Sequence, residues 1–198
     1  ISSEINKGLA KTLIDSEYRV RKASVMVFDE LDVETIWATI TSPAVFSSLL
    51  QLTREKNREV RELCISTVAQ LYSDSICKVT KTSQNVSTWE VVNTIPHVLF
   101  ELYYINDLHI NEQVDRAIFR YLFPIELDDT KRVKRLLNLL LHFDKKTFAS
   151  FFAFNKRQLQ MSFAISKYVE FCEELNKHEA LDDNVEVEAR FKKTTEWL

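Results

Sequence analysis

The sequence predicts an all-α fold, and three observations support this prediction. The 198 residues include one glycine and three prolines, well below average usage of about 7% and 5%, so turn-forming residues are scarce. Apolar side chains recur at helical spacing, and two of the resulting segments repeat each other. We therefore expect more than about 70% helix and almost no strand, against roughly one-third helix in ordinary domains.

The overall composition excludes several classes of protein. Hydrophobic residues make up 45% of the chain, enough to bury a core, and the net charge of -3 gives no global attraction to nucleic acid. The cysteines, Cys64, Cys77 and Cys172, are odd in number and far apart, as in intracellular proteins with reduced thiols. No apolar run is long enough to span a bilayer, so we expect no membrane association. The abrupt ends at Ile1 and Leu198 suggest a piece of a longer chain.

Two amphipathic segments predict the repeat architecture. One carries Val20, Ala23, Val27 and Leu31, and the other carries Val60, Leu63, Thr67, Val68 and Leu71. Superposing the Val-Arg pair at 20–21 on the one at 60–61 aligns Phe28 with Val68, at an offset of 40 residues. Periods of about 40 to 47 residues built from helices are typical of HEAT and armadillo repeats. The sequence thus predicts a HEAT-repeat solenoid of stacked antiparallel helix pairs.

Capping residues and prolines suggest how the chain is divided. We expect two HEAT-type helix pairs over 1–77, a loop over 78–86, further pairs over 87–177, and an acidic connection with a terminal helix over 178–198. Ser42-Pro43 is typical of a helix start, and Ser87 begins a capping-box pattern. Pro96 and Pro124 are expected to flank a helical hairpin, because proline is disfavoured inside helices.

The later helices have their own markers. Asp128 and Asp144 are acidic residues placed where the positive end of a helix favours them. The apolar stripe from residue 157 to residue 174 predicts one long packed helix. Phe191 and Trp197 would anchor the terminal helix.

Residues suited to catalysis or metal binding form no recognisable constellation. The four histidines neither pair at metal-ligand spacing nor cluster with the cysteines. Gly8 stands alone, so no glycine-rich loop can hold a phosphate. Paired carboxylates such as Asp182-Asp183 are best interpreted as helix caps and solvated faces. The sequence predicts no catalytic residue, no metal and no cofactor, and therefore a protein that is not an enzyme.

One segment, from residue 128 to residue 157, has a local excess of positive charge. Its cations are Lys131, Arg132, Lys134, Arg135, Lys145, Lys146, Lys156 and Arg157, against the acidic residues Asp128, Asp129 and Asp144. Such a cluster could contact phosphates, which makes direct DNA binding the alternative function, with the nucleic-acid patch at 134–135, 145–146 and 156–157. A solvated helix face is the simpler interpretation.

Tyr103 and Tyr104 are adjacent near a helix end, and adjacent positions cannot both face one apolar stripe. We expect one of the two rings to be exposed. An exposed tyrosine beside polar groups is typical of an interface anchor, and a tyrosine that caps a helix junction is the alternative.

The segment from residue 95 to residue 158 carries a more specific pattern. It includes Leu102-Tyr103-Tyr104-Ile105-Asn106-Asp107, Ile110-Asn111, Val114-Asp115-Arg116, Tyr121-Leu122-Phe123-Pro124, Leu127-Asp128-Asp129, Arg132-Val133-Lys134-Arg135, Phe151-Phe152-Ala153 and Arg157-Gln158. These residues resemble the precocious-dissociation-of-sisters family, the cohesin-associated HEAT-repeat proteins. They fix polar and aromatic positions that helical periodicity leaves free.

The resemblance implies a nuclear, chromosome-associated protein that binds the kleisin subunit of the cohesin ring and helps maintain or release sister-chromatid cohesion. It also implies the wings-apart-like releasing factor and the cohesin acetyltransferase as further partners. A solenoid suits this role, because its extended surface can hold a disordered segment. The candidate kleisin contacts are Tyr103, Tyr104, Asn111, Asp115, Arg116, Lys131 and Arg132.

Overall fold

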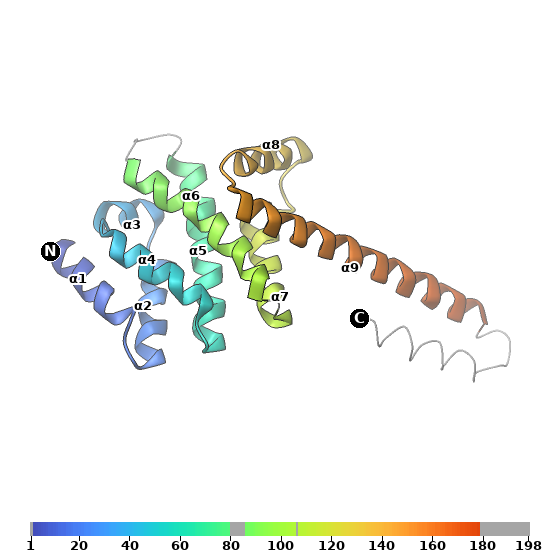
Figure 1. Cartoon of the computed structure of the whole chain (residues 1–198), viewed down its shortest axis with the longest axis horizontal. Coiled ribbons are helices and arrows are strands. Elements are labelled where there is room, and N and C mark those ends of the chain that lie inside the picture. Colours follow the sequence, from blue (N-terminus) through green and yellow to red (C-terminus); the bar gives the residue numbers. More distant parts are fainter. Residues whose placement is uncertain (1, 80–85, 106, 179–198) are drawn as a thin grey trace. The chain divides into compact units, whose positions relative to one another are not determined.

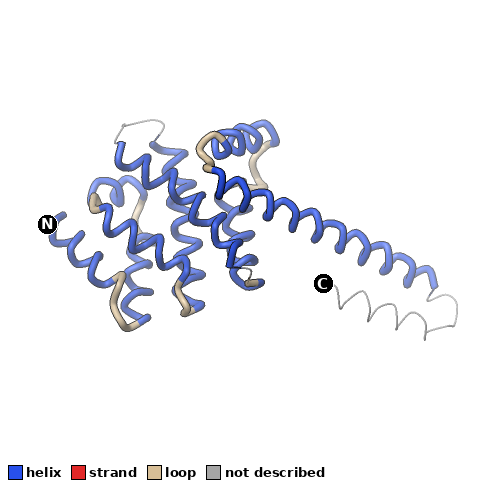
Figure 2. Tube along the Cα trace, in the orientation of Figure 1, coloured by secondary structure: helices blue, strands red, loops and turns tan. Residues whose placement is uncertain are grey.

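The computed structural model describes residues 2–79, 86–105 and 107–178, and all regular secondary structure in these ranges is helical (Figures 1 and 2). The elements are α1 (Ser2–Thr12), α2 (Tyr18–Glu30), α3 (Val33–Thr39), α4 (Pro43–Gln51), η1 (Leu52–Arg54), α5 (Arg58–Val79), α6 (Val86–Glu101), η2 (Leu102–Ile105), α7 (Leu108–Ala117), η3 (Ile118–Leu122), α8 (Asp129–Leu140) and α9 (Lys145–His178). The predicted all-α fold is confirmed. Most of the predicted loop, residues 80–85, lies outside the described residues.

Two compact units divide the chain, residues 1–150 and 151–198. In the first unit, α5 is the central helix, because it packs against α2, α6, α7 and η3. Val60, Val68 and Leu71 of α5 are buried as predicted, and α6 contributes the fully buried Leu99 and Phe100. A helix covered on several sides by its neighbours is the arrangement expected of stacked repeats.

The buried face predicted for α2 is partly wrong. Ala23 and Leu31 are exposed, whereas the buried residues of this helix are Ser24, Val25 and Phe28. The Ser24 hydroxyl donates to the backbone carbonyl oxygen four residues earlier, at 2.9 Å. A small polar residue is therefore accommodated in the core without an unpaired group, which apolar spacing alone could not indicate.

The arginines of the two repeated Val-Arg pairs make equivalent contacts. Arg21 Nη1 donates to the carbonyl oxygen of Asp15 at 2.6 Å, and Arg61 Nη1 donates to that of Glu55 at 2.8 Å. In both cases the acceptor lies six residues before the arginine, in the turn that precedes the helix. Each arginine thus satisfies a main-chain acceptor that a turn would otherwise leave unpaired.

The Nε atoms of the same arginines connect one repeat to the next. Arg21 Nε donates to Glu55 Oε2 at 2.9 Å, and Arg61 Nε donates to Gln113 Oε1 at 3.2 Å. These bonds join α2 to the turn before α5, and α5 to α7. The sequence repeat therefore corresponds to a repeated structural contact.

Helix starts at several predicted positions are confirmed. Pro43 is the first residue of α4 and follows Ser42. Asp128 and Asp144 each accept a hydrogen bond from the backbone N–H three residues later, at 3.0 and 2.7 Å. Asp107 caps α7 in the same way at 3.0 Å, at a position not predicted as a helix start. Such caps satisfy amide groups that have no partner within the helix.

One predicted boundary is wrong, because Pro96 lies inside α6, whereas the helix itself begins at Val86, one residue before the predicted start at Ser87. An interior proline costs a helix about 3 kcal/mol. Ile95 and Leu99 of the same helix are fully buried, and burial of such side chains stabilises the fold by about 1.5–3 kcal/mol each. Packing of α6 therefore offsets its proline.

The three aspartate caps predict an acid-sensitive fold. Backbone N–H groups lower the pKa of Asp107 and Asp144, and a hydrogen bond from Lys131 together with backbone N–H groups lowers the pKa of Asp128. A carboxylate with a lowered pKa stabilises the folded state above its unfolded pKa, and this contribution is lost as the pH falls through the folded pKa.

We expect the triple variant Asp107→Asn, Asp128→Asn, Asp144→Asn to lose less stability than the wild type between about pH 5 and pH 3, because asparagine caps helices without titrating. Urea denaturation followed by circular dichroism at each pH measures this. Equal acid sensitivity of the two proteins would contradict the assignment.

The described part of the second unit is the continuation of α9, residues 151–178. The predicted helix over 157–174 is confirmed, but its predicted packing is wrong for the described residues, because the apolar stripe is exposed to solvent. Phe152, Leu159 and Phe163 are exposed large apolar residues of this helix. The predicted terminal helix with Phe191 and Trp197 lies outside the described residues.

Candidate protein-interaction surface

The turn between α6 and α7 presents a cluster of apolar side chains to solvent. Tyr104 is 57% exposed, and Ile105 and Leu108 beside it in the sequence are also exposed. The Tyr104 hydroxyl is 3.5 Å from the carbonyl oxygen of Lys146, a long hydrogen bond. Tyr103 is half-buried. The expectation that one of the two tyrosines is exposed is confirmed, and Tyr104 is the exposed one.

The α7 helix carries the other candidates of the same segment, and the structure separates them by exposure. Asn111 is 4% exposed and belongs to the helix interface rather than to the accessible surface. Asp115 is half-buried, whereas Arg116 is exposed. Among these three residues, Arg116 is therefore the one whose charged group is exposed to solvent.

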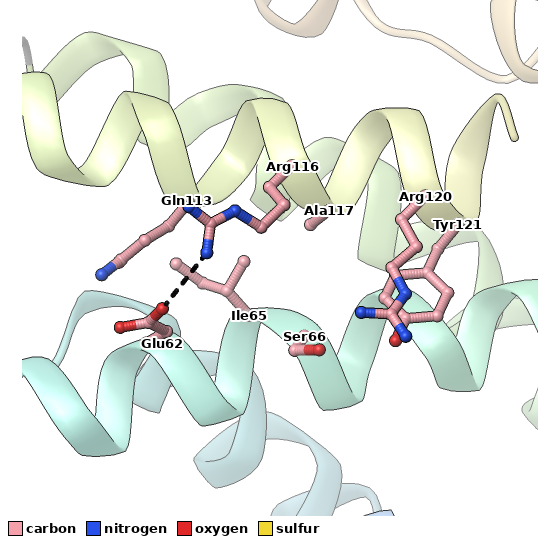
Figure 3. Close-up of a pocket in the computed structure, with 8 residues that line it drawn as sticks. All are labelled: Glu62, Ile65, Ser66, Gln113, Arg116, Ala117, Arg120 and Tyr121. Carbon is pink, nitrogen blue, oxygen red and sulfur yellow. Dashed lines mark ion pairs between the residues drawn. The ribbon is translucent and has the colours of Figure 1, made fainter. Parts of the chain in front are cut away.

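Arg116 lies at the edge of a groove between α5 and the continuous α7–η3 segment (Figure 3). The groove has a volume of about 210 Å³, and its lining residues are Glu62, Ile65, Ser66, Gln113, Arg116, Ala117, Arg120 and Tyr121. Of these residues, only Arg116 is among the contacts predicted from the sequence. The lining residues come from two segments that are about fifty residues apart in the sequence, α5 and α7–η3. The spacing of apolar residues within each helix does not show which faces of the two helices meet.

The charged groups of the groove differ in how they are paired. Arg116 Nη2 is 2.9 Å from Glu112 Oε1, and Arg116 Nη1 reaches across the groove to Glu62 Oε1 at 3.8 Å (Figure 3). The Arg120 guanidinium lies over the ring of Tyr121, 5.4 Å from its centroid. The Arg116 charge is thus shared between two carboxylates, and no ion pair of Arg120 occurs within the described part of the chain.

A π-helical turn, η3, places Arg120 and Tyr121 in the groove. The Phe123 N–H donates to the Ile118 carbonyl oxygen at 2.8 Å, a bond that spans five residues instead of four. π-Helical turns are rare and frequently occur at functional sites. Pro124 follows directly, and nothing in its sequence neighbourhood distinguishes this turn from an ordinary helix end.

The basic residues of α8 and the start of α9 are largely paired. Lys131 pairs with Asp128 at 2.9 Å, and Arg132 pairs with Asp129 at 3.6 Å. Lys146 Nζ lies 3.0 Å from a carboxylate oxygen of Glu101, and Arg135 Nη2 donates to Ser73 Oγ at 3.0 Å.

The patch predicted for nucleic acid involves two helices, with Lys134 and Arg135 on α8 and the pairs at 145–146 and 156–157 on α9. Within this patch, Lys146 is already paired with Glu101. No observation in the described part of the chain supports the predicted direct binding of DNA.

A second cavity, of about 300 Å³, lies between α5, α6 and α8, and its lining includes Trp89 and His142. His97, also in its lining, has Nδ1 2.7 Å from Thr147 Oγ1, and its ring packs against Phe143. These contacts give the His97 imidazole a structural role.

The described residues contain no group of three or more histidine, cysteine or acidic side chains that could hold a metal ion. The cysteines Cys64, Cys77 and Cys172 are free thiols. None of the helices in the described ranges is long and apolar enough to cross a bilayer.

Stacked helices with an exposed tyrosine and a polar groove place the chain among helical-repeat proteins. Comparison with known proteins makes the assignment specific. The family model described as "Sister chromatid cohesion protein PDS5 protein" matches residues 1–198, and the chain therefore belongs to this family.

Individual relatives agree. The chain is 54% identical over 200 residues to the sister chromatid cohesion protein PDS5 of Saccharomyces cerevisiae, covering 100% of the chain and 16% of the relative. It is 24% identical over 197 residues to pds5 of Schizosaccharomyces pombe, covering 98% of the chain and 16% of the relative. The chain thus spans about a sixth of the length of these relatives.

A solved structure, described as "Structure of the Pds5-Scc1 complex and implications for cohesin function", matches with a TM-score of 0.87 and 53% identity. The match covers 100% of this chain and 29% of the solved chain. The predicted HEAT-repeat solenoid is confirmed by this match, as is the resemblance to the cohesin-associated family.

Proposed function

We propose that this chain is part of a non-enzymatic, nuclear and chromosome-associated scaffold that binds the kleisin subunit of cohesin and helps control the maintenance and release of sister-chromatid cohesion. The observation that carries the proposal is the similarity of the whole chain to a Pds5 chain solved in complex with Scc1. Stacked repeats provide the extended surface on which a disordered partner segment can lie.

We place the anchor of this contact at Tyr104. An exposed aromatic ring surrounded by further apolar side chains has the composition of an interface hot spot, and Ile105 and Leu108 provide that surrounding. Arg116 is a second contact. Asn111 and Asp115 are less accessible, and we assign them a role in positioning α7. Lys131 and Arg132 are paired with carboxylates, and we place them at the rim of the kleisin contact.

Tyr104→Ala is expected to weaken binding of the kleisin by about 2 kcal/mol or more, roughly 30-fold, because hot-spot aromatics carry much of an interface's free energy. The melting temperature should not change, since the ring lies largely in solvent. The measurement is a titration of overlapping peptides from the kleisin amino-terminal region, with thermal denaturation recorded in parallel.

Tyr103→Phe is the matched control, because it keeps a half-buried ring and removes only the hydroxyl group. Its affinity should equal that of the wild type. Wild-type affinity of Tyr104→Ala would move the contact to another part of the solenoid, and the absence of any kleisin binding by the wild-type chain would refute the proposed function.

The wings-apart-like releasing factor and the cohesin acetyltransferase are proposed as further partners on the strength of the family alone. No described residue is assigned to either. Co-purification of each factor with the full-length protein, with and without the kleisin, tests this part of the proposal.

A further inference from the structure

The groove between α5 and the α7–η3 segment has a cation, an unpaired amide donor and a size that suits a single side chain. From these features we propose that it receives an acidic side chain of an extended partner segment, with Arg120 binding the carboxylate and Gln113 binding a main-chain carbonyl of the segment. The inference rests on the proposed function, because it takes the segment to be part of the kleisin.

Arg120 is the cation of the groove lining that has no carboxylate partner in the described part of the chain. Its interaction within the described part of the chain is with the ring of Tyr121, 5.4 Å away, whereas Arg116 is already shared between Glu112 and Glu62. A guanidinium stacked on an aromatic face keeps the N–H groups at its edge available. Those N–H groups match the two oxygens of a carboxylate.

Gln113 supplies the amide donor, and its orientation is fixed by Arg61. Arginine has only donors, so the atom of Gln113 that lies 3.2 Å from Arg61 Nε is the amide oxygen. The amide nitrogen then points away from Arg61, and it has no hydrogen-bond partner in the described part of the chain although Gln113 is only 7% exposed. A buried amide donor without a partner is unfavourable. The nitrogen is itself buried, so the Gln113 amide has to turn toward the groove before a carbonyl oxygen of the segment can satisfy it.

The volume of the groove and the residues that line it indicate what kind of group can bind there. A volume of about 210 Å³ is below the roughly 300–1,000 Å³ of typical small-molecule sites, so the groove suits one side chain with its adjoining main chain. Ile65 and Ala117 give apolar contact surface, and Ser66 adds a hydroxyl group.

The test uses the full-length protein and the tightest-binding peptide found among overlapping kleisin amino-terminal peptides. Arg120→Gln should weaken binding about tenfold, the effect of losing one charge-assisted contact. Replacing each Asp or Glu of the peptide by Asn or Gln should identify one position with a similar loss. Combining that peptide with Arg120→Gln should add no further loss, because both changes remove the same contact. Arg19→Gln is the matched control, because Arg19 is an exposed arginine of α2 that lies over the ring of Tyr18, 5.8 Å from its centroid, away from the groove lining, and it should bind as the wild type does.

Gln113→Glu tests the second residue without disturbing the fold. The substitution keeps an oxygen for Arg61 and replaces the amide donor by an acceptor, so peptide affinity should fall at least tenfold while the melting temperature is retained.

Wild-type affinity of both Arg120→Gln and Gln113→Glu, in a protein that does bind the kleisin peptide, would overturn this inference and leave the proposed function intact. Additive losses in the Arg120→Gln and peptide combination would overturn the assigned carboxylate contact. The absence of any peptide binding by the wild type would overturn both proposals.

Discussion

Val60→Asp is expected to unfold the first unit at temperatures where the wild type is folded. Val60 is 0% exposed on α5, the helix that contacts both neighbouring repeats. A lone buried carboxylate costs several kcal/mol, and total stabilities of domains are only about 5–15 kcal/mol. Since solenoid stability depends on nearest-neighbour interfaces, the damage should extend to α2 and α7.

The position of Val60 near the start of α5 gives the new carboxylate some compensation. A negative charge at a helix N-terminus is stabilising by about 0.3–2 kcal/mol, which is less than the cost of burying it. Arg58→Asp is the matched control, because Arg58 lies in the same first turn and is exposed. Thermal denaturation followed by circular dichroism should show a large loss for Val60→Asp and almost none for Arg58→Asp. Equal melting curves of the two variants would mean that the α5 face has been misassigned.

How far the fold could be predicted is clear from the two repeated helices. Val60, Val68 and Leu71 were placed correctly, because α5 is long and rich in apolar residues at regular spacing. The predicted buried face of α2 differs from the observed one by about one residue. The reason is that Ser24 belongs to the core of this helix, and its burial depends on a hydrogen bond. The rule that proline ends a helix gave the wrong boundary at Pro96. The packing of α6 against its neighbours offsets the local free-energy cost of an interior proline, and the sequence indicates only that local cost.

The candidate site divides in the same way. The exposure of one tyrosine at 103–104 followed from helix geometry, because adjacent side chains point about 100° apart. Which of the two tyrosines is exposed depends on how η2 packs, and the sequence does not show this packing. The groove was invisible, because it combines residues of two helices with a π-helical turn that no residue pattern marks. Glu62 and Arg120 come together only when α7 and η3 lie on α5.

Arg61→Met is expected to lower the free energy of unfolding by about 2–4 kcal/mol, the second largest effect. Methionine retains much of the apolar length of the side chain and removes every donor. The carbonyl oxygen of Glu55 loses a charge-assisted bond of 2.8 Å, and the amide of Gln113 loses its bond of 3.2 Å. Hydrogen bonds to charged groups contribute about 1.5–3 kcal/mol each, and the acceptors left without partners add a penalty.

Arg21→Met is the natural comparison, because Arg21 makes the equivalent contact to a preceding turn and its Nε atom pairs with Glu55. Urea denaturation of the two variants should give similar losses of stability, as expected if the repeated Val-Arg pair has one structural role. Binding of the kleisin peptide should distinguish the two variants. Only Arg61 orients the Gln113 amide, so Arg61→Met should also weaken the kleisin peptide at temperatures where the variant is fully folded, whereas Arg21→Met should not. A stability loss below about 0.5 kcal/mol in both variants, within the range of ordinary surface substitutions, would show that the arginine contacts accompany the repeat without stabilising it.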